Sequence, residues 1–146
     1  MMKIFTIGFT KKTAEQFFGL LDRPDIKRVV DIRLNNSSQL ASYTKSADLR
    51  FFLNRILGKD YLHLPVLAPS AEMLKAYRDG SGDWEGYEKE FLLLMNERRV
   101  HDTVPIELID GGCLLCSEPT ADKCHRRLVA EHLVEKWPTA QIIHLV

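Results

Sequence analysis

The residues with the clearest chemical potential lie in one short segment near the end of the chain, between Cys113 and Arg126. Its reactive side chains are Cys116, Glu118, Cys124, His125 and Arg126. A thiol, a carboxylate, an imidazole and a guanidinium can together supply a nucleophile, a proton carrier and a group that binds anions. We therefore predict the functional centre here and take Cys116, Glu118 and His125 as the catalytic candidates.

The same segment raises the question of a metal site, because thiolates and imidazoles bind zinc and iron. Cys113 and Cys116 have the Cys-x-x-Cys spacing of many zinc sites. They lie, however, in an apolar run typical of a strand, where residues three apart point to opposite faces. Cys113 is therefore predicted to be a small core residue. The leading expectation is a site without metal, and the alternative is zinc or iron held by Cys116, Cys124 and His125.

Nucleophilic or redox chemistry is the other possibility for these thiols. A cysteine that ends a strand and faces a helix N-terminus, with two arginines nearby, would have its thiolate form stabilised. The arrangement resembles phosphatases and rhodaneses in outline. The phosphatase signature needs an arginine six residues after the cysteine, and that position is Asp122, whose charge would repel a phosphate. A Cys116–Cys124 disulfide, a thiol transfer step and a pair of inert, half-buried cysteines all stay open.

The neighbouring polar residues each have a functional and a structural interpretation. Glu118 and Arg126 can form an ion pair that ties the loop to the next helix. His125, at a helix N-terminus, is expected to be neutral and available as base, ligand or hydrogen-bond donor. Asp31 and Arg33, two apart, lie on the same face of a strand and can pair, or Asp31 can cap the following turn. For the remaining aromatic and histidine residues, structural packing is the favoured interpretation. These residues are Trp84, Tyr87, Phe91, His132 and His144.

The elements that must position these residues follow an alternating pattern. Five apolar segments are typical of strands, at residues 3–7, 28–32, 61–64, 112–116 and 141–146. Helical patterns lie between them, at about 13–21, 46–58, 70–78, 83–99 and 122–136. The first opens with a capping box of Thr13 and Gln16 and turns Phe17, Leu20 and Leu21 inward. The second opens at Ser46, places Leu49, Phe52, Leu53 and Ile56 on one face, and stops at Gly58. The pattern predicts an α/β three-layer sandwich, with a mostly parallel sheet of about five strands flanked by helices.

In such a sheet, ligands bind at the edge formed by the carboxyl ends of the strands. The candidate ligand-binding residues at that edge are Gly8, Thr10, Asp31, Arg33, Ser37, Ser38, His63, Cys124 and Arg126. Arg33, Arg126 and the N-terminus of the last helix can hold a negative charge. We therefore expect a small anionic ligand.

Composition bounds the remaining classes of protein. The length of 146 residues suits a single domain spanning residues 1–146. Acidic and basic residues number 20 each, so a nucleic-acid partner is not expected, although a local basic patch is compatible with the balance. No run is long enough to span a bilayer and the first residues do not resemble a signal peptide, so a cytoplasmic protein without membrane contact is expected. Three cysteines do not build a disulfide framework. The oligomeric state is not indicated.

Several motifs together resemble a known family. They are Thr6–Thr10, Val30–Arg33, Tyr61–Pro65, and the closing pair Leu115–Pro119 and Cys124–Arg127. In this order they are similar to the motifs of the domain-of-unknown-function 488 family. The resemblance implies a compact α/β domain with the motifs gathered at one edge of the sheet, and it implies no activity. The chain departs from the commoner pattern at Gln39, where an arginine often stands, and at Leu67–Pro69, which replaces a Leu-Gly-Gly-like turn.

Three functional hypotheses follow, and the sequence leaves open whether the protein is an enzyme. The leading one is a domain that binds a small anionic or nucleotide-type ligand at the carboxyl edge of the sheet, with catalysis by a thiol or a carboxylate. The second is a metal-binding or thiol redox sensor module. The third is a non-catalytic domain that interacts with a protein or a nucleic acid.

Overall fold

A computed structural model gives the structure of residues 2–35, 42–80, 83–116 and 124–146. One sheet runs through its centre, with the strand order β3-β2-β4-β1-β5 and only parallel pairings. The strands are β1 (Lys3–Gly8), β2 (Arg28–Asp31), β3 (Asp60–His63), β4 (Gly112–Cys116) and β5 (Gln141–His144). The predicted five-stranded sheet is therefore confirmed, and the predicted strand bounds hold to within two residues.

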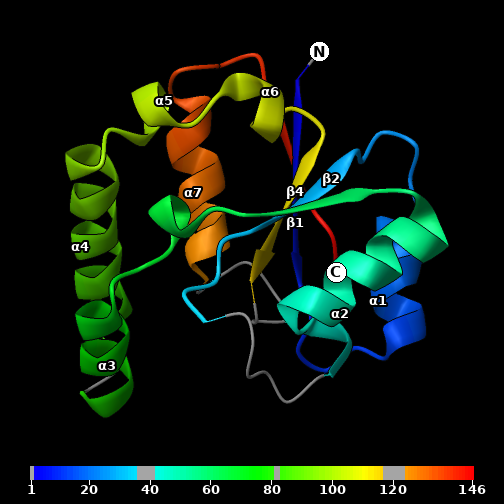
Figure 1. Ribbon diagram of the computed structural model, residues 1–146. Coiled ribbons are helices and arrows are strands. Elements are labelled where there is room, and N and C mark those ends of the chain that lie inside the picture. Colours follow the sequence, from blue (N-terminus) through cyan, green and yellow to red (C-terminus); the bar gives the residue numbers. More distant parts are fainter. Residues whose placement is uncertain (1, 36–41, 81–82, 117–123) are drawn as a thin grey trace.

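Helices cover both faces of the sheet (Figure 1). On one side lie α1 (Ala14–Leu21), α2 (Ser46–Phe52) and the π-helix η2 (Leu53–Leu57). On the other side lie α3 (Ala71–Asp79), α4 (Trp84–Glu97) and α7 (His125–Val134). Shorter elements complete the chain, namely η1 (Ser42–Thr44), η3 (Pro65–Leu67), α5 (Val100–Thr103) and α6 (Ile106–Ile109). The predicted three-layer α/β sandwich is confirmed.

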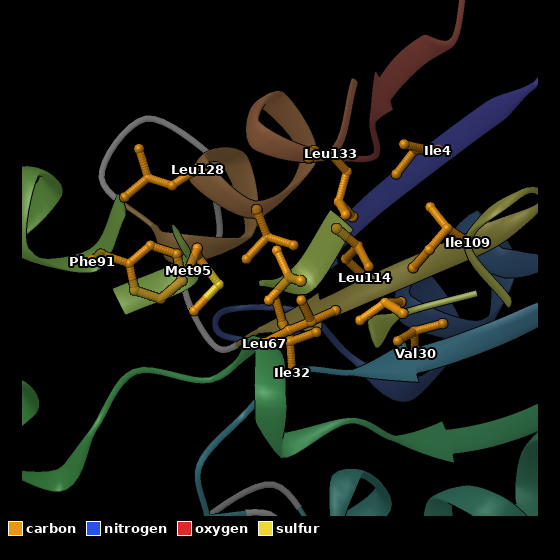
Figure 2. Close-up of a cluster of buried hydrophobic side chains, with 14 of the residues drawn as sticks. Ile4, Val30, Ile32, Leu67, Phe91, Met95, Ile109, Leu114, Leu128 and Leu133 are labelled. Atoms are coloured by element: carbon orange, nitrogen blue, oxygen red, sulfur yellow. The ribbon is translucent and has the colours of Figure 1, made fainter. Parts of the chain in front are cut away.

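The sheet separates two apolar cores, which explains why its strands have continuous apolar sequences. Leu114 of β4 belongs to the core under α4 and α7, whereas its neighbours Cys113 and Leu115 belong to the core under α1 and α2. Figure 2 shows the first core, in which Leu133 of α7 lies beside Leu114 of the sheet and Leu128 lies beside Phe91 of α4. Cys113 has no exposed surface, so its predicted role as a small core residue is confirmed.

Local signals fix several helix ends as predicted. The Thr13 Oγ1 accepts from the backbone N–H of Gln16 at 3.1 Å, and the Gln16 side chain accepts from the Thr13 N–H at 2.9 Å. This capping box orders the first turn of α1 and brings Phe17 and Leu21 into the core, with no exposed surface. Gly58 ends the second helical segment with a φ of 65°, a conformation that favours glycine because it has no Cβ.

The prediction that Ile56 shares one helical face with Leu49 and Leu53 is wrong, because its side chain is 57% exposed whereas theirs are buried. Leu53, three residues earlier, is fully buried. The difference arises because residues 53–57 form a π-helix, whose wider turn rotates later side chains away from the α-helical face. The last predicted helix also begins later than expected among the described residues, at His125, and residues 122 and 123 lie outside them.

Among the residues that the structure describes, no helix combines the length and the apolar character that crossing a membrane requires.

Candidate functional site

Motifs that are distant in the sequence meet at one edge of the sheet. This edge is formed by the carboxyl ends of β1, β2, β3 and β4. Gly8 at the end of β1 pairs in register with Cys116 at the end of β4. Asp31 at the end of β2 pairs with Leu115 on one side and with His63 on the other. Four of the predicted edge residues, Gly8, Asp31, His63 and Cys116, therefore lie along one line across the sheet.

The first residue of α7 contacts the end of β4. The imidazole Nδ1 of His125 lies 3.3 Å from the Sγ of Cys116, and both side chains are buried. The other ring nitrogen, Nε2, lies 2.8 Å from the carbonyl oxygen of Ile32. A carbonyl oxygen only accepts hydrogen bonds, so Nε2 carries a proton, and in the neutral form of the ring the lone pair is on Nδ1. The ring of Phe91 packs edge-on at 5.7 Å, between centroids. His125 is thus held as a base directed at Cys116.

Cys124, the residue that caps α7, adds a second thiol to this pair. Its Sγ donates to the Sγ of Cys116, with 2.8 Å between the sulfur atoms, and both cysteines are free. Burial raises the pKa of Cys124 well above the ordinary thiol value, and its contact with Cys116 raises it further, while His125 acts in the opposite direction. Cys124 is therefore a protonated donor, and its hydrogen bond favours the thiolate form of Cys116 over the thiol. Hydrogen bonds run from Cys124 through Cys116 and His125 to the Ile32 carbonyl.

Cys113 takes no part in this chain. It lies on the opposite face of β4 without exposed surface, and burial raises its pKa strongly. The nearby charges of Arg126 and Lys59 only partly offset the effect of burial. Cys113 is a structural thiol.

The end of β2 is organised by a buried ion pair, as predicted for Asp31 and Arg33. Arg33 donates from Nε and Nη2 to the two carboxylate oxygens of Asp31 at 2.8 and 2.7 Å. Asp31 also accepts from the Arg33 backbone N–H at 3.1 Å and from the hydroxyl of Tyr61 at 2.5 Å. The guanidinium donates to the Thr44 carbonyl and lies 5.5 Å above the Phe9 ring. Because its oxygens are occupied, Asp31 acts as an anchor for Arg33.

One part of Arg33 is left for a ligand. Its Nη1 is buried and has no hydrogen-bond partner within residues 2–35, 42–80, 83–116 and 124–146.

The carbonyl of Arg33 accepts from the Nε2 of His63 at 2.7 Å. Ile32 and Arg33, next to each other in the chain, thereby fix the tautomers of two histidines, His125 and His63, whose Nδ1 atoms carry the lone pairs.

Two further cations lie at the same edge. Arg126 is fully buried, and its Nε donates to the Thr6 hydroxyl at 3.4 Å, which is itself 2.6 Å from the Nδ1 of His144. Lys12 follows β1, and its pKa is lowered by burial and then by the positive charge of Arg126. Two cations close enough to oppose each other favour a bound anion. Lys12 was not among the site residues predicted from the sequence, although its position just after the first predicted strand places it at the carboxyl edge of the sheet.

Not every predicted site residue joins this cluster. Thr10 lies in the turn after β1 and lines a surface pocket of about 470 Å³ together with Lys12 and Val146. Ser37, Ser38 and Glu118 lie outside the described residues, and so does the predicted ion pair between Glu118 and Arg126.

The ligand set for the alternative metal site is Cys116, Cys124 and His125, whose donor atoms all lie within 4.8 Å of one another. The hydrogen bond from His125 to a carbonyl is typical of a metal-bound histidine. Two thiolates on a tetrahedral zinc lie about 3.8 Å apart, whereas these sulfur atoms are 2.8 Å apart. A metal would require one thiol to move.

A second cluster with metal-binding chemistry consists of His101, His132 and Glu135. The two imidazoles stack with centroids 4.2 Å apart and planes 11° apart. A metal lies close to the plane of each ring that binds it, and two stacked planes share no such point. His132 is a packed structural residue, with 4% of its surface exposed.

These features define an α/β protein with a cysteine–histidine pair at the carboxyl edge of a parallel sheet. Residues 13–133 match the model of the family described as "Domain of unknown function DUF488". The match covers well over half of the chain, so the protein belongs to the DUF488 family, as its motifs predicted. No curated protein and no solved structure matches the chain significantly.

Proposed function

We propose that this protein binds a small anion, or the anionic part of a nucleotide-type ligand, at the carboxyl edge of its sheet and acts on it through the thiol of Cys116. The observation that carries the proposal is the position of His125, with Nδ1 at 3.3 Å from Cys116 Sγ and Nε2 at 2.8 Å from the Ile32 oxygen. The carbonyl orients the ring in the way that a third group orients the base in a nucleophile–base pair.

The thiol step follows from this chain of hydrogen bonds. The proton of Cys116 moves to the Nδ1 of His125, and the Cys124 thiol donates to the resulting thiolate. The thiolate sulfur then forms a bond to the electrophilic atom of the substrate. The bond to the leaving group breaks, and that group takes the proton from Nδ1. The N-terminal end of α7, which begins at His125, further favours negative charge on Cys116.

The cations at the edge account for the choice of an anionic substrate. Arg33 has a buried Nη1 with no partner in the described part of the chain. Arg126 is buried, and its charge acts on Lys12. Asp31 neutralises the charge of Arg33 but leaves its Nη1 without a partner in the described residues, and a ligand anion placed there would also be attracted by Arg126 and Lys12.

Competitive alkylation tests the proposal. The protein is treated with iodoacetate, an anion, or with iodoacetamide, its neutral analogue, and the modified cysteine is identified by mass spectrometry. Cys116 should react first with both reagents, and the rate ratio of iodoacetate to iodoacetamide should exceed the ratio for free glutathione. If the protein and free glutathione gave the same rate ratio, the proposed anion site would be contradicted. If Cys113 or Cys124 were modified first, the proposed role of Cys116 as the nucleophile would be contradicted. The Cys116→Ala variant is the control for assignment.

Elemental analysis of protein purified without an affinity tag separates this function from the metal alternative. The proposal predicts less than stoichiometric zinc and iron in the wild type. A stoichiometric metal that disappears in Cys116→Ala would replace the thiol mechanism with a metal site.

One observation favours a second candidate function, thiol–disulfide exchange, namely the contact between the sulfur atoms of Cys116 and Cys124. The Cys116 thiolate would attack a disulfide RSSR and release RS⁻, and Cys124, after losing its proton, would displace the second RS⁻. The substrate gains two electrons, and the protein loses them in forming a Cys116–Cys124 disulfide. Incubation with oxidised glutathione should then yield this internal disulfide. A stable glutathione adduct on Cys116 would contradict the second step.

A further inference from the structure

A pocket at the opposite end of the sheet lies between the second helical segment and the edge strand. It has a volume of about 710 Å³, within the range of small-molecule sites. Figure 1 shows α2 beside the edge strand β3, and α2 and η2 both contact β3. Arg28 and Asp60, which line the pocket, are the first residues of β2 and β3, whereas Cys116 is the last residue of β4. The pocket is therefore separate from the thiol site.

The charge of this pocket is strongly positive. Its lining contains four cationic side chains, those of Arg28, Arg50, Arg55 and Lys59, and a single carboxylate, that of Asp60. None of the four cations forms an ion pair with a carboxylate of the described residues. Lys59 is buried and donates to the carbonyls of Arg23 and Ile26, and Nη1 of Arg28 donates to those of Leu108 and Asp110. The exposed guanidinium groups of Arg50 and Arg55 are therefore the cations most open to an anion, and the positive charge of the whole concave surface attracts it.

Two of these cations lie against aromatic rings. Phe51 lies in the lining with 55% of its surface exposed. The guanidinium carbon of Arg55 is 5.7 Å from the centre of the Phe51 ring, and that of Arg50 is 5.1 Å from the centre of the Tyr61 ring. Exposed aromatic rings and arginine guanidinium groups are the surfaces on which nucleobases stack. The pocket thus offers a planar stacking surface next to a site for negative charge.

We propose that this pocket, which we call the α2–β3 pocket, binds a free nucleoside phosphate. The base stacks against Phe51 and the guanidinium of Arg55, and the phosphates pair with Arg50 and Arg28. A free nucleotide fits better than a nucleic-acid strand, because the formal net charge of the whole chain is zero. A long polyanion would extend beyond this local patch over a surface with no excess of positive charge. The proposal does not rest on the chemistry of Cys116.

Calorimetric titration tests the proposal on the full chain with ADP and UDP as probes. We expect a saturable site that the pocket variants below weaken, with adenosine alone and inorganic phosphate alone binding there at least about tenfold more weakly. Arg50→Ala, Arg55→Ala and Phe51→Ala should each weaken binding about tenfold, because each removes a charge-assisted contact or a stacking surface. These side chains are exposed, so the variants should keep the wild-type unfolding midpoint.

Matched controls lie on α4, at Lys89→Ala for the loss of a charge and Leu93→Ala for the loss of an exposed apolar side chain. Both should bind as the wild type does. Saturating ADP should also leave the alkylation rate of Cys116 unchanged, which separates this pocket from the thiol site. The proposal is overturned if neither nucleotide binds, if the three pocket variants bind normally, if phosphate binds as tightly as ADP, or if a single-stranded oligonucleotide binds more tightly than ADP.

Discussion

His125 and His63 come from distant parts of the chain, yet each donates its Nε2 proton to one of two consecutive carbonyls at the end of β2. The carbonyl of Ile32 accepts from His125 at 2.8 Å, and that of Arg33 accepts from His63 at 2.7 Å. The end of β2 therefore sets the tautomer of both imidazoles. Its own position depends on the buried pair of Asp31 and Arg33.

Removing the charge of Asp31 should be costly. Asp31→Asn leaves the guanidinium of Arg33 buried without its bidentate partner, and we expect a loss of about 3–5 kcal/mol in the free energy of unfolding, measured with urea. Asp25→Asn is the matched control, because Asp25 pairs with Arg23 and Lys3 in a partly exposed position. It should cost much less than Asp31→Asn, because solvent screens an exposed ion pair. Equal losses in the two variants would show that the Asp31 pair is not a buried anchor.

The core under α4 and α7 gives a second prediction. Leu128 is 1% exposed and lies beside Phe91 in Figure 2, whereas Leu93 on α4 is 63% exposed. Leu128→Ala should lower the free energy of unfolding by about 2–5 kcal/mol through lost burial and a cavity. Leu93→Ala should change it by about 0.5 kcal/mol or less. Equal losses in the free energy of unfolding of the two variants would contradict the packing of α7 described above.

His132 should make stability depend on pH. Burial lowers its pKa, the charge of His101 lowers it further, and Glu135 opposes both. The unfolded chain therefore takes up a proton at a higher pH than the folded chain does. Stability is complete above the unfolded pKa of about 6.5 and falls as the pH drops toward the lower pKa of the folded state.

In His132→Gln this loss should disappear, so the free energy of unfolding should fall less between about pH 7 and about pH 5 than in the wild type. Urea titrations at several pH values measure the slope. An unchanged slope would show that His132 is protonated equally in the folded and unfolded states.

Much of the fold follows from local sequence patterns. The run Gly112–Cys116 is apolar at every position because both of its faces are covered, and such a run is recognisable without a structure. The capping box of Thr13 and Gln16 could also be predicted from the sequence, since it depends on residues only three apart. The orientation of Ile56 was not, because nothing in that sequence marks where an α-helix widens into a π-helix.

The site was partly predictable for a similar reason. The topology of a parallel sheet brings Cys116 and His125 to the same edge, and side-chain chemistry identifies both. The acceptor that orients His125 is the backbone of Ile32, and every residue has a carbonyl, so residue types carry no signal for it. The contact between Cys124 and Cys116 depends on the extended conformation of Cys124 before α7, which only the tertiary structure fixes.

The central claim is that His125 takes the proton of Cys116, and the ultraviolet absorbance of thiolates measures this directly. Below about pH 9, Cys113 and Cys124 should contribute nothing, since burial raises the pKa of both. The comparison is between wild type, Cys116→Ala and His125→Gln, in which the glutamine amide can still donate to the Ile32 carbonyl but offers no base. We predict a thiolate near neutral pH in the wild type, none in Cys116→Ala, and one that appears only at higher pH in His125→Gln. The same titration curve in the wild type and in His125→Gln would contradict the account.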